Sequence, residues 1–211
     1  MGEVFALSSI RVKFLRGEEV KYISHLDLMK VFERSLRRSG IPVAYSQGFN
    51  PHPHMVFGLP LSVGVTSETE YADIELAESI KPSEFVDRLN RELPQGISVI
   101  GAAEREDSGN IMASIAEASY EITVVCDKEL TMDFVRQRVD DFMGRPQIIT
   151  AKETKQGTKD IDIKPMIRKL GAAEVDGHKC RFSTVLSAGS KSNLKPELLV
   201  QALNEFSGDD M

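Results

Sequence analysis

The hydrophobic period of the sequence switches repeatedly between two residues and about 3.6 residues, and this switching constrains the fold more than any other feature. Residues 8–16 alternate between apolar and polar side chains, which is typical of a half-buried strand. Residues 24–40 place apolar side chains at helical spacing, with Ser24 as the N-cap and Gly40 as the stop. The segments that follow predict strands at 43–46 and 68–76, a helix at 81–93 and a strand at 96–106. The first half therefore predicts the order β-α-β-β-α-β.

The same alternation of strand and helix patterns returns after residue 110. It predicts a strand at 119–126, a helix at 131–144, a strand at 147–155, a strand that runs into one helical turn ending at Gly171 (161–171), a hairpin at 172–188 that turns at Asp176–Gly177, and a helix at 195–206. We therefore expect an α+β protein of two tandem ferredoxin-like β-α-β-β-α units with mainly antiparallel sheets, each with one sheet face open for binding. The expected units are residues 1–110, with a Gly/Pro/His loop at 45–64, and residues 111–211, with a basic segment at 145–195.

The composition describes a globular chain of 211 residues, with 41% hydrophobic and 27% charged residues. No stretch approaches the roughly 18 uninterrupted apolar residues of a membrane-spanning helix, and the start of the chain lacks the pattern of a signal peptide. We therefore expect a cytoplasmic protein without a membrane partner. Two cysteines, Cys126 and Cys180, are too few for a disulfide framework, a four-cysteine zinc site or an iron–sulfur cluster. Both lie on the apolar phase of their strands, which predicts buried thiols.

The net charge of −6 hides an uneven distribution along the chain. Residues 1–60 carry a net charge of +3, residues 61–110 of −7, and residues 145–195 of +6. Two basic regions separated by an acidic one either form an anion-binding surface or reflect uneven solvation of the surface. For the first alternative, cations on an exposed sheet face would contact phosphates: Arg11, Lys13, Lys179 and Arg181.

The loop at 45–64 combines polar side chains with several Gly and Pro residues. Loops of this length are uncommon in compact domains unless they have a function. Its polar groups could bind a phosphate, a base edge or an amino acid. The alternative is an Ω-loop in which Gly and Pro only shape the chain. The candidate binding residues of this loop are Tyr45, Ser46, Gln47, Gly48, Phe49, Asn50, His52 and His54.

Three of the four histidines, His25, His52 and His54, fall close together in the sequence. Their spacing matches no standard zinc site, so we expect no metal. His25 or His54 could instead act as acid and base in a metal-independent RNA-processing enzyme, beside the arginines of the first helix: Arg34, Arg37 and Arg38. In a simpler interpretation, His25 is a half-buried histidine at a helix start, and Ser24 and Asp27 only cap that helix. The signature motifs of common hydrolases, nucleotide-binding proteins and metalloproteases are absent from the sequence.

A second group of candidate binding residues lies in the basic segment: Lys155, Asp160, Asp162, Lys164 and Arg168. Asp160 and Asp162 share one strand face, with cations nearby. A carboxylate pair in such a setting can form a site, but it is more often a salt-bridged strand end. The sequence leaves both alternatives open.

Two runs of the sequence are distinctive: KYISHLDLMKVFERSLRRSGIPVAYSQGFNPHPHMVFGLPLSVGVTSETEYADIEL at 21–76, and KDIDIKPMI at 159–167. They resemble the bacterial radical-SAM-associated (radical-SAM-linked) family, a domain of unknown function. The motif of that family, roughly S-H-x-D followed by S-x-G-F-N-P-H-P, maps onto Ser24, His25, Asp27, Ser46, Gln47, Gly48, Phe49, Asn50, Pro51, His52 and Pro53. After the second Pro the family commonly has a basic residue, and this chain has His54.

The resemblance implies a functional partnership, because members of that family occur beside, or fused to, a radical-SAM protein. Such a partner uses an iron–sulfur cluster and S-adenosylmethionine. This chain lacks a C-x-x-x-C-x-x-C motif, so it cannot itself be the radical initiator, and we expect it to bind no cofactor. Tandem ferredoxin-like units with a glycine-rich loop are also similar in architecture to the CRISPR repeat-processing endoribonucleases.

Three functions follow as hypotheses. The leading one is a non-catalytic accessory protein that binds structured RNA or a ribosome-related substrate and presents it to a radical-SAM protein. The second is the RNA-processing enzyme, with His25 or His54 as acid and base. The third is a protein–protein adaptor whose basic segments meet an acidic partner.

Overall fold

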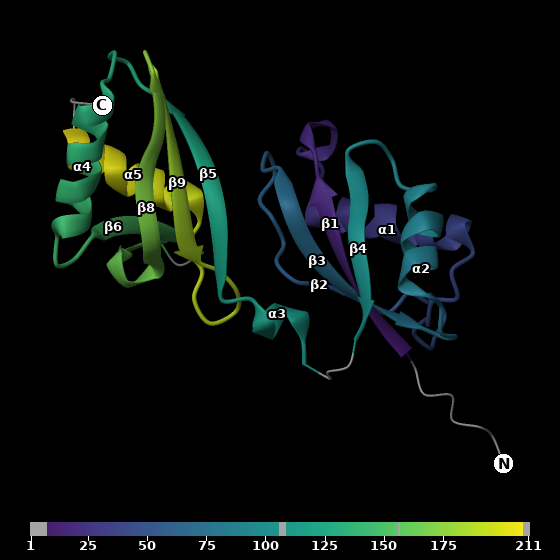
Figure 1. The fold of residues 1–211 in the computed structure, drawn as a ribbon. Helices are drawn as coiled ribbons and strands as arrows, with labels where there is room; N and C mark the ends of the chain where they lie inside the picture. Colours follow the sequence, from purple (N-terminus) through teal and green to yellow (C-terminus); the bar gives the residue numbers. More distant parts are fainter. Residues whose placement is uncertain (1–7, 106–108, 156, 209–211) are drawn as a thin grey trace. The chain divides into compact units, whose positions relative to one another are not determined.

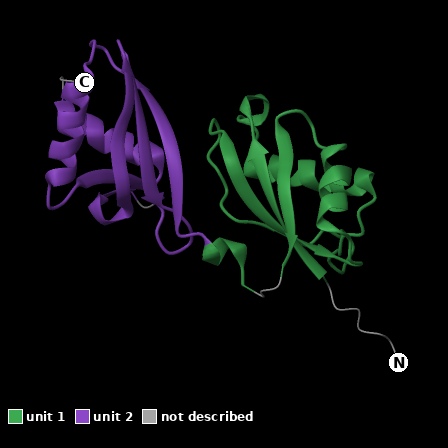
Figure 2. Cartoon of the chain, viewed as in Figure 1, with its two compact units in different colours: residues 1–114 green, residues 115–211 purple. Residues whose placement is uncertain are grey.

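The computed structural model describes residues 8–105, 109–155 and 157–208 of the chain. These residues form a mixed α+β structure in which every pairing between described strands is antiparallel. The expected α+β class with mainly antiparallel sheets is therefore confirmed. The chain divides into two compact units, residues 1–114 and residues 115–211 (Figures 1 and 2). None of the described helices has the length and apolar character needed to cross a membrane.

Unit 1 contains a four-stranded antiparallel sheet. Its strands stand in the order β2 (Met55–Phe57), β3 (Ser67–Leu76), β1 (Ser8–Arg16) and β4 (Ile97–Glu104). The helical elements are η1 (Glu18–Val20), α1 (His25–Ser39), α2 (Pro82–Asn90) and the short α3 (Ile111–Ser114). Along the chain, the long elements follow the predicted alternation of strands and helices, except for one strand.

That exception is the predicted strand at 43–46, which is wrong. The segment forms only isolated bridges, from Val43 to Leu76 and from Tyr45 to Pro53. Pro42 precedes the segment and Pro53 lies opposite it, and neither has an N–H group to extend a ladder. Within the loop expected at 45–64, the short run HMVFG contains a strand, β2.

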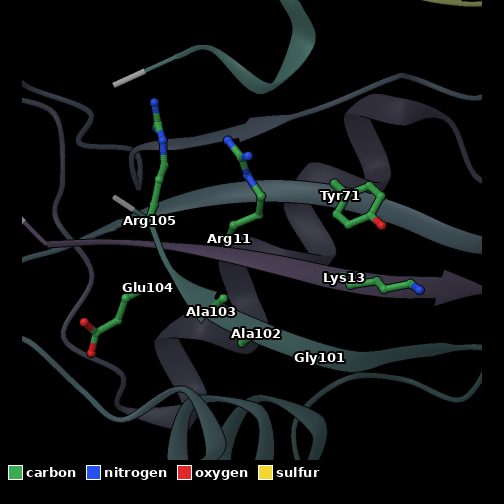
Figure 3. A pocket seen from close by; sticks show the side chains of 8 residues that line it. All are labelled: Arg11, Lys13, Tyr71, Gly101, Ala102, Ala103, Glu104 and Arg105. Atoms are coloured by element: carbon green, nitrogen blue, oxygen red, sulfur yellow. The ribbon is translucent and has the colours of Figure 1, made fainter. Parts of the chain in front are cut away.

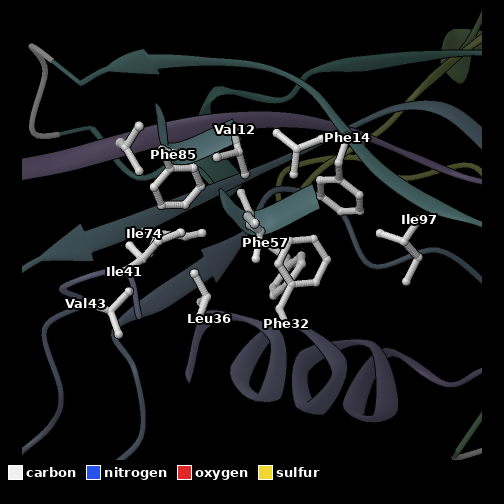
Figure 4. Close-up of a cluster of buried hydrophobic side chains, with 14 of the residues drawn as sticks. Val12, Phe14, Phe32, Leu36, Ile41, Val43, Phe57, Ile74, Phe85 and Ile97 are labelled. Carbon is white, nitrogen blue, oxygen red and sulfur yellow. The ribbon is translucent and has the colours of Figure 1, made fainter. Parts of the chain in front are cut away.

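One face of the unit 1 sheet packs against both long helices. Val12 and Phe14 of β1 belong to the same buried cluster as Phe32 and Leu36 of α1 and Phe85 of α2 (Figure 4). Phe14 and Phe32 meet edge to face, with ring centroids 5.0 Å apart. Because successive side chains of a strand alternate between faces, Arg11 and Lys13 of β1 point to the opposite, open face of the sheet.

Unit 2 contains a three-stranded antiparallel sheet and a separate two-stranded hairpin. The sheet has the order β5 (Glu117–Val125), β9 (Lys179–Ser187) and β8 (Ile167–Asp176). The hairpin consists of β6 (Ile149–Thr154) and β7 (Gly157–Asp162). The helical elements are α4 (Met132–Gly144), η2 (Lys164–Met166) and α5 (Pro196–Ser207).

Four described strands lie between the two long helices of unit 2, the number that the predicted segments give, whereas the β-α-β-β-α order of a ferredoxin-like unit has two. The helical turn expected within 161–171 is present as η2, but Gly171 lies inside β8 and not at the end of a helix. Asp162 accounts for the break after β7, since its carboxylate accepts hydrogen bonds from the N–H groups of Ile148 at 2.9 Å and Lys164 at 3.0 Å. The predicted turn at Asp176–Gly177 joins β8 to β9, as expected.

Cys126 and Cys180 are buried, which confirms the prediction of core thiols. They share a cluster with Val135 of α4 and Phe182 of β9. Burial raises the pKa of the Cys180 thiol to about 11, with a smaller contribution from Cys126. Both thiols therefore pack as small apolar side chains.

Candidate functional site

Ser24 and Asp27 lie at the start of α1. The Ser24 hydroxyl accepts a hydrogen bond from the backbone N–H of Asp27 at 3.1 Å and donates one to the Asp27 carboxylate at 2.7 Å. The hydrogen bond from Ser24, followed by one from Lys30, lowers the pKa of Asp27. Both residues therefore cap the helix, as the simpler interpretation of the sequence predicts.

His25 is half-buried in the first turn of α1. Its ring packs edge-on against Phe57 of β2, with centroids 5.5 Å apart, and Phe57 in turn contacts Phe14 and Phe32. Burial lowers the pKa of His25, and the positive charge of Arg16 lowers it further. The imidazole is therefore a neutral member of an aromatic cluster near pH 7.

Two buried charged residues, Arg16 and Glu70, were not singled out from the sequence. Arg16 is 1% exposed, and its guanidinium donates to the carbonyls of Val20, Lys21 and Ile23 at 3.4, 2.9 and 2.7 Å. Glu70 of β3 is also buried, and burial raises its pKa to about 7 while the charge of Arg16 opposes the shift. Both residues occupy the apolar phase of their strands, and this is the signal that could have found them.

Residues 46–52 form a closed loop, named here the 46–52 loop. The Ser46 N–H donates to the carbonyl of His52 at 2.9 Å, and the His52 N–H donates to the Ser46 hydroxyl at 3.0 Å. Gly48 has a φ of +132°, a backbone conformation that favours glycine. Phe49 follows it with a relative exposure of 113%, so the whole ring is open to solvent.

Glu33 of α1 connects the helix to the 46–52 loop. One of its carboxylate oxygens lies 3.9 Å from Nδ1 of His52, and the other lies 3.8 Å from the guanidinium of Arg37. Asn50 donates to Nε2 of the same His52 ring at 3.1 Å. Arg34 is exposed on α1 one turn before Arg37. Arg34, Arg37 and the 46–52 loop together are called the α1–loop surface below.

The structure separates this surface from the other candidates of unit 1. Glu33 follows His25 by eight positions in α1, which corresponds to about 12 Å along the helix axis. Arg38 binds Glu92 at 2.9 Å. The backbone N–H of His54 donates to Ala44 at 2.9 Å, before β2. The loop candidates occupy exposed or partly exposed positions: Tyr45, Ser46, Gln47, Gly48, Phe49, Asn50, His52 and His54.

The candidates of unit 2 serve local structure or lie apart. Lys164 donates to the carbonyl of Met143 at the end of α4, and Arg168 pairs with Glu117 at 2.9 Å. Asp162 is occupied by the two backbone N–H groups described above. Asp160, on the exposed hairpin, faces Ala151, and Lys155 lies in the turn of that hairpin. These contacts favour the interpretation of a strand end over that of a site.

The open face of the unit 1 sheet carries a hollow of about 630 Å³ (Figure 3). We call it the sheet hollow, and its lining residues are Arg11, Lys13, Tyr71, Gly101, Ala102, Ala103, Glu104 and Arg105. Gly101 lies opposite Lys13, and Ala103 lies opposite Arg11, in the β1–β4 pairing. Two small residues therefore leave the floor of the hollow low beside two long cationic side chains.

Asp73 lies under this face and joins two of its arginines. Arg11 binds the Asp73 carboxylate through two hydrogen bonds, at 2.7 and 2.9 Å, and Arg105 lies 3.3 Å from it. Asp73 stands on the outward phase of β3, where the strand period alone predicts exposure, but it is only 4% exposed and is covered by the arginines. Tyr71 and Arg105 were not singled out, although Tyr71 stands on the same outward phase of β3 as Asp73.

The two cations expected on the sheet of unit 2, Lys179 and Arg181, both lie on β9. Arg181 lies between Glu121 of β5, at 3.9 Å, and Glu174 of β8. Each carboxylate offsets part of its charge. Of the predicted sheet-face cations, Arg11 and Lys13 line the sheet hollow.

In the part of the chain that the structure describes, no three His, Cys, Asp or Glu side chains gather to hold a metal ion. A family model described as "Uncharacterized protein conserved in bacteria (DUF2344)" matches residues 9–196. The chain belongs to this family. The family match includes both the α1–loop surface and the sheet hollow. No curated protein matches the sequence.

Proposed function

We propose that the protein is a non-catalytic accessory protein that binds RNA, structured or ribosome-related, and presents it to a radical-SAM enzyme. The α1–loop surface is the proposed contact with RNA. One observation carries this proposal: Phe49 is fully exposed on a closed loop whose His52 lies 3.9 Å from Glu33 of the arginine-bearing helix α1.

An exposed aromatic ring suits RNA because unstacked bases bind by stacking on aromatic side chains. The hydrogen bonds between Ser46 and His52 hold the loop closed before any ligand binds, which reduces the entropy lost on binding. Arg34 and Arg37 stand on the same surface and would contact phosphates. Stacking and phosphate contacts together give affinity with little sequence preference.

The arrangement of the histidines favours binding over catalysis. Of the two histidines considered as acid and base, His25 packs its ring against Phe57, and His54 lies before β2, where its backbone N–H donates to the carbonyl of Ala44. A general acid and base for RNA cleavage would need to converge on one phosphate. The RNA-processing enzyme and the protein–protein adaptor are therefore kept as outcomes of the test.

The partner enzyme is proposed from the resemblance to the radical-SAM-linked family, and it would supply the iron–sulfur cluster and S-adenosylmethionine. We also propose that the protein acts in the cytoplasm, where the RNA and the radical-SAM enzyme would be found. We further propose that each unit is a variant of the ferredoxin-like fold. The strand order β4-β1-β3-β2 with both long helices packed on one face supports this for unit 1, whereas unit 2 would carry the β6–β7 hairpin as an addition.

Fluorescence anisotropy with labelled tRNA and rRNA fragments, measured across a salt series, tests the proposal. We expect Arg37→Ala to reduce the slope of log K against log salt by about one, and Phe49→Ala to cost about 1–3 kcal/mol of binding free energy. Arg136→Ala is the matched control, since Arg136 is an exposed helix arginine of unit 2. Absence of binding at low salt would overturn the proposal and favour the adaptor. RNA cuts that disappear in His25→Ala would favour the enzyme.

A further inference from the structure

The sheet hollow lies on the face of the unit 1 sheet that is opposite to α1 and α2. The proposed RNA contact on the α1–loop surface leaves it unused. Its volume, about 630 Å³, falls in the range of roughly 300–1,000 Å³ that is typical of small-molecule sites. Gly101 and Ala103 keep its floor low, so a flat group can approach the backbone of β4.

An aromatic ring and a cation stand side by side in the hollow. Tyr71 of β3 is 36% exposed, and Lys13 of β1 is its direct partner in the β1–β3 pairing (Figure 3). No described residue forms an ion pair with Lys13. A planar ring can therefore stack on Tyr71 while an anionic group attached to it meets the Lys13 ammonium.

Two further cations are held in fixed positions at the other end of the hollow. The guanidinium groups of Arg11 and Arg105 project side by side above the sheet (Figure 3), and both bind the single carboxylate of Asp73. The side chain of Arg11 is 26% exposed, and it lines the hollow. Glu104 also lines the hollow, but its side chain points away from both arginines (Figure 3).

The combination of one aromatic ring and several cations in a hollow of this size matches one ligand chemistry. We propose that the sheet hollow binds a nucleotide, with the base stacked on Tyr71 and the phosphate between Lys13 and Arg11. The nucleotide is either free or one unit of a single-stranded RNA. The inference rests on the proposed function only in the latter case, and it uses a different surface of unit 1.

Isothermal titration of the full chain with adenosine 5′-monophosphate, adenosine, inorganic phosphate and a single-stranded RNA hexamer tests this proposal. We expect saturable binding of the mononucleotide, and weaker binding of adenosine or phosphate alone. Tyr71→Leu and Lys13→Gln should each weaken the mononucleotide by about tenfold. The matched controls are Tyr22→Leu and Lys81→Gln, which change an exposed tyrosine and an exposed lysine outside the hollow, and they should leave the affinity unchanged.

The comparison of the mononucleotide with the RNA hexamer also identifies the source of the nucleotide. A hexamer that binds more tightly than the mononucleotide, and that depends on Tyr71, supports a site for one unit of a strand. A mononucleotide that binds at least as tightly as the hexamer supports a site for a free nucleotide. Absence of binding of both ligands, or equal binding by wild type and both hollow variants, overturns the proposal.

The failure of this inference can be distinguished from the failure of the proposed function. If Phe49→Ala weakens RNA binding but Tyr71→Leu and Lys13→Gln do not, the sheet hollow is excluded as an RNA site and the α1–loop surface stands. The reverse pattern excludes the α1–loop surface and supports the hollow. Thermal melting of each variant checks that unit 1 stays folded, which is expected because Tyr71 and Lys13 are outside its core.

Discussion

Glu70 lies directly opposite Phe14 in the β1–β3 pairing, on the face of the sheet that packs against α1. Its Oε1 atom has no hydrogen-bond partner among the described residues. Burial raises the pKa of this carboxyl group to about 7, although the nearby charge of Arg16 acts in the opposite direction. The neutral acid is therefore the form that the folded core accommodates best.

From this relationship we expect the stability of unit 1 to fall as the pH rises. The pKa of the carboxyl group is 4.5 in the unfolded chain and about 7 in the folded one. The folded state therefore holds the proton more tightly, and this stabilisation is complete below pH 4.5 and lost as the pH passes about 7. The difference amounts to about 3 kcal/mol. Urea unfolding at a series of pH values, followed by circular dichroism, measures it.

The Glu70→Gln variant isolates this effect, because it has no carboxyl group to titrate in the core. The pH dependence of other groups, including the opposite contribution of His25, is present in both proteins and cancels in the comparison. We expect the loss of stability between pH 5 and pH 8 to be smaller in the variant by about 3 kcal/mol. Identical pH profiles for the two proteins would show that Glu70 does not titrate in this range.

Arg16 is expected to be essential for the turn between β1 and α1. Its guanidinium donates to three backbone carbonyls there, and Arg16→Met would remove these donors, although the carbonyls of Val20 and Lys21 also accept from the N–H groups of Ile23 and Gly64. We expect a loss of about 3 kcal/mol of unfolding free energy, measured by urea denaturation. The control Arg136→Met removes an exposed arginine and should change stability by less than about 0.5 kcal/mol. A similarly small effect of Arg16→Met would contradict this role.

Ser24→Ala distinguishes helix capping from a role in ligand binding. The substitution removes the hydroxyl that accepts from the Asp27 N–H and donates to its carboxylate, so we expect a loss of about 1 kcal/mol and a higher pKa of Asp27. Ser24→Asp keeps a capping acceptor and should restore most of the stability. Thermal unfolding and carboxylate titration by NMR measure both effects. An unchanged melting temperature with weaker RNA binding would instead assign Ser24 to the ligand.

The periodic segments of unit 1 were predictable because burial on one side imposes a period on the sequence. Val12 and Phe14 alternate with polar residues, and Phe32 and Leu36 recur at helical spacing, because all four side chains lie in one core. Of the separate β6–β7 hairpin, β6 lies within the strand predicted at 147–155, whereas most of β7 was not predicted. The mostly exposed residues of β7 have no buried face to impose a period, and its end is set by the hydrogen bonds of Asp162.

The candidate sites were predictable only in part, because sequence patterns identify side chains but not their partners. The 46–52 loop was found from its Gly, Pro and polar residues, whereas its contact with α1 depends on Glu33, which has no distinctive pattern. The sheet hollow was represented by Arg11 and Lys13 alone. The strand period predicts that Asp73 points outward, but it does not reveal the two arginines that cover its carboxylate.

Asp73 gives a last prediction, in which charge and geometry act in opposite directions. Asp73→Asn adds one unit of positive charge near the sheet hollow, which by itself would strengthen the binding of an anion. The substitution also removes the carboxylate that holds Arg11 and Arg105, and the new amide has only one acceptor oxygen for two guanidinium groups. Because the ligand would then have to order both arginines, we expect the mononucleotide to bind several-fold more weakly.

The matched control for Asp73→Asn is Glu104→Gln, which makes the same change in charge at the lining of the hollow without touching the Asp73 carboxylate. We expect this variant to bind the mononucleotide as well as, or slightly better than, the wild type. We also expect Asp73→Asn to lower the unfolding free energy by about 2 kcal/mol, because it breaks a buried ion-pair cluster whose arginines stay partly exposed. Tighter mononucleotide binding by both variants would show that net charge, and not the fixed position of the arginines, determines affinity at the hollow.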